Sequence, residues 1–125
     1  MEVRKFSFEN LEVYQVARVL VRDIYRLQKR FPAEERFELG DQVRRAATSI
    51  TSNIAEGSGR NSIKEKIHFI EIAFGSMTET FSQLQNAQDL GYISEADVET
   101  LRTQYNHVAA LLSNLKKHFD AQLQH

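Results

Sequence analysis

The sequence predicts an all-α fold, an antiparallel up-down four-helix bundle that forms one domain over residues 1–125. Apolar side chains recur every third and fourth residue in four separate segments, which is the spacing of one helix face. Only one proline and five glycines interrupt the 125 residues, so the elements are long. No segment alternates with a period of two over enough residues to predict a sheet.

The first helix is expected over residues 9–30. Pro32 ends it, because the residue before a proline avoids the helical conformation. The apolar face of this helix consists of Val13, Val16, Ala17, Leu20, Ile24, Leu27 and Phe31.

The second helix is expected over residues 41–57, with Gly40 or Asp41 as its N-cap. Gly57 and Gly59 are stop signals, and Gly57 is expected to adopt the left-handed conformation of a helix cap. The apolar stripe consists of Val43, Ala46, Ala47, Ile50 and Ile54. The turn that follows carries an expected structural motif made of Asn53, Glu56, Gly57, Gly59 and Arg60.

The third helix, expected over residues 62–90, has the clearest start. Ser62 caps an early backbone N–H and Glu65 reaches back to it, which makes a capping box. Gly91 is the natural residue to end this helix. The apolar stripe advances in steps of four and three through Ile63, Ile67, Ile70, Phe74, Met77, Phe81 and Leu84.

The fourth helix is expected over residues 95–119. Ser94 and Asp97 form a weaker capping box at its start. Because the connections between helices are short, consecutive helices run antiparallel. The apolar stripe consists of Val98, Leu101, Tyr105, Val108, Leu112, Leu115 and Phe119.

Small residues gather on the second and third helices, where they allow two helices to approach closely. Gly75 lies inside a predicted helix, where glycine costs about 1 kcal/mol relative to alanine, so close packing is its expected role. A bound ligand at this position is the alternative. The cluster consists of Ala46, Ala47, Ser49, Ser52, Ala73, Gly75 and Ser76.

The first and third helices carry more apolar surface than one bundle needs. A second apolar row widens the main stripe on each, and we interpret this row as a subunit interface. Burial under loops is the alternative. The interface candidates are Leu11, Tyr14, Val21, Tyr25, Phe69 and Ile72.

Composition narrows the functional classes. The chain has no cysteine, which excludes disulfides and thiolate metal sites and fits a reducing, cytoplasmic location. We find no leader pattern and no apolar run of membrane length, so no membrane partner is expected. The formal net charge of −1 argues against strong overall attraction to nucleic acid. The charge is unevenly distributed, because residues 67–100 carry acidic side chains and no lysine or arginine.

The sequence shows no catalytic or metal-binding pattern, and we expect no enzyme activity, cofactor or metal. Glu65 and His68 form one Glu-x-x-His motif, whereas a di-iron bundle needs two. Ser58 lies between two glycines but outside a Gly-x-Ser-x-Gly elbow. No two histidines show the i, i+4 spacing of a helical metal site among His68, His107, His118 and His125.

Five basic residues are the candidate nucleic-acid site: Arg44, Arg45, Arg60, Lys64 and Lys66. Arg60 and Lys64 flank the second turn, where the N-terminus of the third helix adds partial positive charge. Arg44 and Arg45 lie about 22 Å away by helical rise, which makes two separate patches. The alternative is a set of surface ion pairs, such as Glu56 with Arg60.

Longer motifs resemble one bacterial family. The chain carries QVRRAATSI at residues 42–50 and NIAEGSGR at residues 53–60. Flanking motifs are LEVYQVA at 11–17, FPAEE at 31–35, FIEIAFGSMTE at 69–79 and LGYI at 90–93. Together these motifs, spread over about residues 6–119, resemble the bacterial four-helix bundle protein family, also called the 23S rRNA intervening-sequence protein or S23 family.

The resemblance implies a bundle that assembles into a ring-like homopentamer. Members of the family are encoded within intervening sequences of 23S rRNA genes or stand alone. A related accessory variability protein of retroelements binds nucleic acid and a reverse transcriptase, although such relatives are strongly basic. The resemblance therefore implies other copies of the chain, RNA, or a reverse transcriptase or other nucleic-acid protein as partners. A protein-binding or self-assembling scaffold without a nucleic-acid role is the alternative.

Overall fold

The computed structural model describes residues 2–124, and every long element in it is a helix. The four α-helices are α1 (Glu12–Gln28), α2 (Leu39–Ser58), α3 (Ile63–Asp89) and α4 (Glu95–Leu123). Two short 3-10 helices, η1 (Ser7–Asn10) and η2 (Ala33–Glu35), lie before α1 and before α2. Residues 2–124 contain no strand, so the all-α prediction is confirmed.

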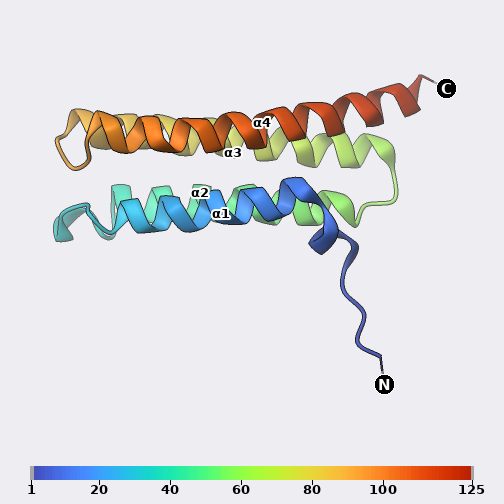
Figure 1. Cartoon of the computed structure of the whole chain (residues 1–125), viewed down its shortest axis with the longest axis horizontal. Helices are drawn as coiled ribbons and strands as arrows, with labels where there is room; N and C mark the ends of the chain where they lie inside the picture. The colour runs from blue at the N-terminus through green and yellow to red at the C-terminus, as the bar shows by residue number, and fades with distance from the viewer. Residues whose placement is uncertain (1, 125) are drawn as a thin grey trace.

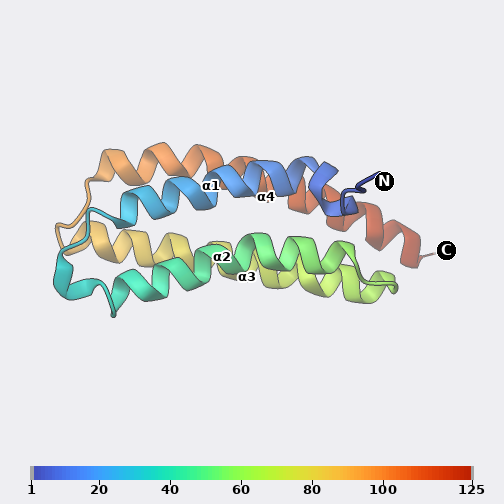
Figure 2. The same ribbon diagram turned by 90° about the horizontal axis from the view of Figure 1, so that it is seen from below.

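The helices form an up-down bundle. Each helix packs against two others, α1 and α3 both lying between α2 and α4. The α1–α2 and α3–α4 turns lie at one end of the bundle, and the α2–α3 turn lies at the other end with both termini (Figures 1 and 2). Side-chain hydrogen bonds join the two turns at the first end, from Tyr92 to Glu35 at 2.7 Å and from Arg30 to Asp97 at 2.8 Å.

Several helix ends differ from their predicted positions. The α1 helix ends at Gln28 rather than residue 30, and α2 begins at Leu39 with Glu38 as its N-cap, so the predicted caps Gly40 and Asp41 lie inside the helix. The chain from Ser7 to Asn10 is a 3-10 turn rather than the start of α1, and Glu9 accepts a 2.7 Å hydrogen bond from the Phe6 backbone. At the other end of the chain, α4 continues to Leu123, beyond residue 119. It continues because no glycine or proline follows Gly91 to interrupt it.

The core runs along the bundle axis between the four helices. Each helix contributes side chains with no exposed surface, including Leu20, Ile50, Leu84 and Leu112. Two polar side chains meet within this core, since the hydroxyl of Tyr105 lies 2.7 Å from that of Thr80. Burial raises the pKa of Tyr105 well above its usual value, and the hydrogen bond to Thr80 opposes that rise.

The two predicted capping boxes, at Ser94 and Ser62, form to different extents. The box at Ser94 is complete, since Ser94 and Asp97 exchange hydrogen bonds of 2.9 and 3.1 Å. The hydrogen bond from the Ser94 backbone is the main reason why the pKa of Asp97 lies below its usual value. At Ser62, only the serine half of the predicted box forms within the described chain, with a 3.0 Å bond from the Glu65 backbone.

Gly91 ends α3 as predicted. Its φ of +83° is the left-handed conformation that suits glycine. The N–H groups of Gly91 and Tyr92 donate to the carbonyls of Gln88 and Ala87, both at 2.9 Å, which is the Schellman pattern.

Gly57 has a different role from the predicted one. Among the described residues only Gly91 has a positive φ, so Gly57 is not a left-handed cap. It is buried within α2, and the helix ends one residue later, with Gly59 as its cap at φ −88°. A Cβ at Gly57 would lie 2.8 Å from the Cβ of Phe69. Gly57 is therefore small because α3 packs directly against it.

Close packing of α2 and α3 was predicted correctly, but not at Gly75. The two helices share the most extensive contact in the bundle, and Ser49 and Ser76 meet across it with their hydroxyl oxygens 2.7 Å apart. Gly75 is exposed, and a Cβ added there would meet no atom of the described chain within 4 Å. Within one chain, the close-packing prediction is therefore wrong for Gly75.

Candidate nucleic-acid interface

A groove of about 510 Å³ runs along the surface between α1 and α2. Four cations from α1 and its C-terminal end line it, namely Arg18, Arg22, Arg26 and Lys29. Tyr14, Val21 and Tyr25 form its apolar floor, and Thr48 and Thr51 line it from α2. These α1 residues recur every three or four positions, so they share one side of the helix. We call this surface the basic groove.

One carboxylate accounts for the ion pairs of the basic groove. Asp23 lies 3.1 Å from Arg22 and 3.7 Å from Arg26, measured between the paired nitrogen and oxygen atoms. The guanidinium of Arg18 lies over the Tyr14 ring at 5.9 Å from its centroid. Arg18 and Lys29 have no carboxylate oxygen within 4 Å in the part of the chain that the structure describes. The groove is therefore positively charged.

The two tyrosines add aromatic surface to this charge. Both are half-buried and pack against the core, which fixes their rings at the groove floor. The Phe8 ring meets Tyr14 edge-on at a centroid distance of 4.8 Å. Cations beside aromatic faces are the combination that contacts phosphates and stacked bases in single-stranded nucleic acid.

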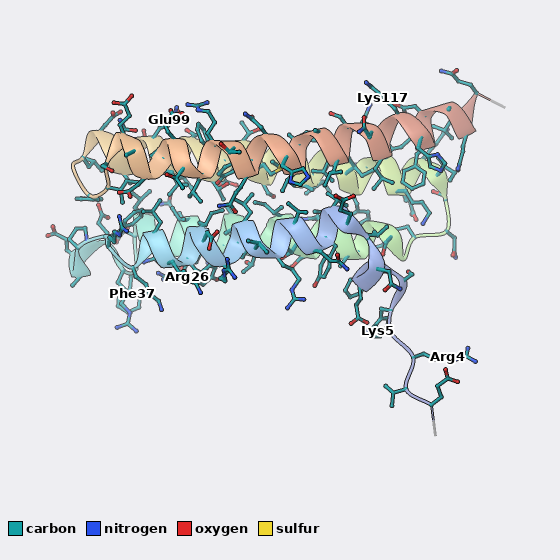
Figure 3. All side chains as sticks on the ribbon, viewed as in Figure 1. Arg4, Lys5, Arg26, Phe37, Glu99 and Lys117 are labelled. Carbon is teal, nitrogen blue, oxygen red and sulfur yellow. The ribbon has the colours of Figure 1, made fainter. Side chains whose placement is uncertain are left out.

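At Lys29 the basic groove adjoins a second hollow of about 640 Å³ at the α1–α2 turn. Arg36, Phe37 and Arg44 line this hollow, and Phe37 is 79% exposed. Figure 3 shows Arg26 and Phe37 on the same side of the bundle, near this turn, while Glu99 lies on the opposite side. Cations therefore line both hollows, although Asp41 pairs with Arg44 at 3.7 Å in the second one.

Arg44 and Arg45 lie at this end and make local contacts. Arg44 donates to the side chain of Gln28 at 2.9 Å and to the carbonyl of Arg36 at 2.8 Å. Arg45 pairs with Asp41 at 3.1 Å. Arg44 is therefore held within the fold, whereas Arg45, with 81% of its side chain exposed, is held by one surface ion pair.

The other three predicted basic residues lie at the α2–α3 turn, at the opposite end of the bundle (Figure 2). Arg60 forms the predicted ion pair with Glu56 and lies over the Phe69 ring at 4.7 Å from its centroid. Lys66 donates to the carbonyl of Ser58 at 3.1 Å. Lys64 is exposed, without a carboxylate oxygen within 4 Å among residues 2–124. Two separate patches are therefore present, as the sequence predicts.

Three residues of the predicted turn motif, Glu56, Gly57 and Arg60, lie around Phe69. Gly57 gives Phe69 room, and the ion pair of Glu56 with Arg60 lies beside the same ring. Asn53 points elsewhere, donating to the Ser49 carbonyl at 2.7 Å and to its hydroxyl at 2.9 Å. Asn53 therefore joins α2 to α3 through Ser49, while Gly59 is the helix cap.

The single chain leaves all of the predicted interface residues partly exposed. Tyr14, Val21 and Tyr25 line the basic groove, and Arg60 covers one face of Phe69. The same partial exposure applies to the whole set, Leu11, Tyr14, Val21, Tyr25, Phe69 and Ile72. The subunit interface thus stays a prediction, with the apolar surface that it requires present.

Comparison with known proteins decides the family. The sequence profile of the 23S rRNA-intervening sequence proteins matches residues 9–114. The chain belongs to this family. A solved structure from Bacteroides thetaiotaomicron, of a protein of unknown function from the S23 ribosomal protein family, has the same fold at a TM-score of 0.76. The two chains are 24% identical over 84% of this chain and 98% of the other. Among curated proteins, none matches the chain significantly.

The groove cations of this intervening-sequence protein were missed as a site by sequence reasoning. Their spacing was the available signal, because Arg18, Arg22 and Arg26 recur every fourth residue and Lys29 follows Tyr25 by four. Such spacing on a helix usually indicates a solvated face. Only the position of α2 beside this face shows that the cations border a groove.

Residues 2–124 hold no group of three or more histidine, cysteine, aspartate or glutamate side chains placed to bind a metal ion. One of the four histidines, His125, lies outside the described residues. No described helix is both long enough and apolar enough to cross a membrane.

Proposed function

We propose that this intervening-sequence protein is a non-enzymatic RNA-binding protein whose basic groove contacts the sugar-phosphate backbone. The composition of the groove carries the proposal, since four cations and two tyrosines line it. Asp23 is paired with two of these cations, Arg22 and Arg26. The net charge of −1 hides this local excess of positive charge.

The physical driving force would be the release of counterions from the RNA. Each phosphate neutralised by lysine or arginine frees condensed cations, so affinity falls steeply as salt is added. Residues four apart rise about 6 Å along a helix, so Arg18 to Arg26 spans about 12 Å of backbone. The tyrosine rings suit unpaired bases, which favours single-stranded loops over duplex RNA.

The test is fluorescence anisotropy with a labelled RNA hairpin that has a single-stranded loop. The groove variant Arg18→Gln/Arg22→Gln/Lys29→Gln should bind at least about tenfold more weakly than wild type, and its salt slope should fall by about 2–3. The control Arg102→Gln/Lys116→Gln/Lys117→Gln on α4 loses the same three charges and should bind like wild type. Thermal melts establish that both variants fold.

Two outcomes would contradict the proposal. If both triple variants lose affinity equally, binding follows net charge and the groove is not the site. If the wild type binds no RNA at low salt, the RNA function is wrong. The exposed Phe37 beside the groove would then favour the alternative, a protein-binding or self-assembling scaffold with no nucleic-acid role.

We further propose that the protein is a homo-oligomer, with five copies as the number implied by the family resemblance. The outer side of α3 supports assembly, because the exposed Gly75 costs the helix about 1 kcal/mol without a packing partner among the described residues. A neighbouring subunit packed on Gly75 and the half-exposed Ile72 would compensate that cost. Repetition of the groove around a ring would also let one RNA engage several copies, which strengthens binding.

Light scattering after size exclusion tests the assembly. The wild type should elute with five times the mass of one chain, and Ile72→Glu should release monomers because it places a charge in an apolar contact. The control Thr103→Glu adds the same charge at an exposed position on α4 and should leave the mass unchanged. A wild type that stays monomeric across micromolar concentrations would overturn the assembly proposal and leave the RNA proposal standing.

A further inference from the structure

A pocket opens at the end of the bundle because the helices differ in length. At 1.5 Å per residue, the 17 residues of α1 extend about 25 Å and the 29 residues of α4 about 43 Å. The α1 helix begins only at Glu12, so the C-terminal part of α4 passes beyond it (Figure 1). In place of a fourth helix, Ser7 and Leu11 border a cavity of about 190 Å³. We call this cavity the end pocket.

The walls of the end pocket are mainly apolar. Ile54 from α2, Ile70 from α3 and Leu112 from α4 line it, and each is at most 4% exposed. Leu115 and Phe119 extend the α4 wall. An apolar cavity of about 150 Å³ accepts a benzene molecule, so this pocket has room for one ring or a short alkyl chain.

A cation, Lys66, lies at the edge of the pocket. Lys66 lines it, with its amino group 3.1 Å from the Ser58 carbonyl and 5.9 Å from the Phe119 ring centroid. A lysine ammonium carries three donors, of which the Ser58 carbonyl takes one. No carboxylate oxygen of the described chain lies within 4 Å of Lys66. Asn53 also lines the pocket, and its amide nitrogen donates to the carbonyl and the hydroxyl of Ser49.

We propose that the end pocket binds a small amphipathic carboxylate, such as a short-chain fatty acid or a monocyclic arylcarboxylate. The apolar part of the ligand lies among Ile54, Ile70 and Leu112, and its carboxylate accepts hydrogen bonds from Lys66. Burial of the apolar part supplies affinity, and the ammonium group selects an anion over a neutral molecule of the same size. This site lies at the α2–α3 turn and shares no residue with the basic groove.

The experiment titrates hexanoate into the full-length, ¹⁵N-labelled protein and follows backbone amide shifts by NMR. Saturable shifts are expected at Ser58, Ile70 and Leu112, with smaller or weaker responses to hexanol. Lys66→Met keeps the stem of the side chain and removes its charge, and it should weaken hexanoate binding about tenfold. Lys64→Met removes an exposed charge two residues away and serves as the control, with unchanged affinity expected.

A variant that fills the end pocket tests whether hexanoate binds there. Leu115→Phe narrows the pocket from its half-exposed α4 wall and should abolish the hexanoate shifts while the protein keeps its melting transition. The proposal is overturned if hexanoate gives no saturable shifts at millimolar concentration. It is also overturned if Lys64→Met and Lys66→Met weaken binding equally, or if hexanol binds as tightly as hexanoate. No RNA is present, so these outcomes are independent of the proposed function.

Discussion

Replacing Gly57 with alanine should destabilise the protein, although alanine is the better helix former. The helical preference alone would stabilise α2 by about 1 kcal/mol. Against it, the new Cβ would lie 2.8 Å from the Cβ of Phe69, which is closer than two carbon atoms approach. The Phe69 Cβ is attached directly to its backbone and cannot rotate away, so α3 must shift. Such overpacking costs about 1–3 kcal/mol, and we take the upper value because the Ser49–Ser76 hydrogen bond must also move.

The expected net loss for Gly57→Ala is about 2 kcal/mol, or a melting temperature lower by about 6–10 °C. Gly59→Ala is the matched control, because its Cβ would lie 3.6 Å from the Glu56 carbonyl, at ordinary contact distance, and its φ of −88° suits any residue. We expect Gly59→Ala to stay within about 0.5 kcal/mol of wild type.

The assay is urea unfolding followed by circular dichroism, run at several protein concentrations because assembly adds concentration-dependent stability. The test is which of the two variants is less stable, rather than the absolute free energy of unfolding of either. A Gly57→Ala protein as stable as Gly59→Ala would refute the packing argument, since it would mean that α2 and α3 do not meet closely at this residue.

Three further predictions use the same assay. Tyr105→Phe should cost about 1 kcal/mol, because it removes the hydroxyl bonded to the buried Thr80; no loss would mean that this bond contributes nothing. Gln83→Met should be neutral or stabilising, because the Gln83 side-chain oxygen is buried without a hydrogen-bond donor in the described chain, and a clear loss of stability would reveal an unseen partner. The backbone of Ser94, aided by Arg30, holds the pKa of Asp97 below its usual value, so folding favours the ionised carboxylate. That stabilisation is present above the unfolded-state pKa and is lost as pH falls through the folded-state pKa. The advantage of wild type over Asp97→Asn in urea midpoint should therefore be constant above about pH 5 and shrink as the pH falls below about 4, and a difference that stays constant down to low pH would contradict this assignment.

The sequence was sufficient for the fold because the deciding patterns are local. Each apolar stripe lies within one helix, and the helix ends at Ser94 and Gly91 depend on residues within a few positions of each other. These local rules predict the wrong role for Gly57, since a glycine near a helix end usually indicates a cap. Its actual constraint is Phe69, which comes from the next helix and becomes a neighbour only after the chain has folded.

The candidate site was harder to predict, because a groove belongs to two helices. Tyr14, Val21 and Tyr25 were recognised as surplus apolar surface, but the cations between them were not connected to that surface. Arg60 and Lys66 attracted attention because they cluster in sequence. The structure pairs Arg60 with Glu56 and places Lys66 at the end pocket, away from the basic groove, with one of its donors on the Ser58 carbonyl. The sequence identifies the cations, whereas only the fold shows which of them line one surface.

Ultraviolet crosslinking of the protein to RNA, followed by mass spectrometry of the peptides, tests the central claim most directly. Crosslinked nucleotides should appear on Tyr14 or Tyr25 in the basic groove, and they should disappear in the Arg18→Gln/Arg22→Gln/Lys29→Gln variant. Crosslinks confined to Phe119 or Tyr92, outside the groove, or groove crosslinks that survive the triple substitution, would contradict RNA binding along α1.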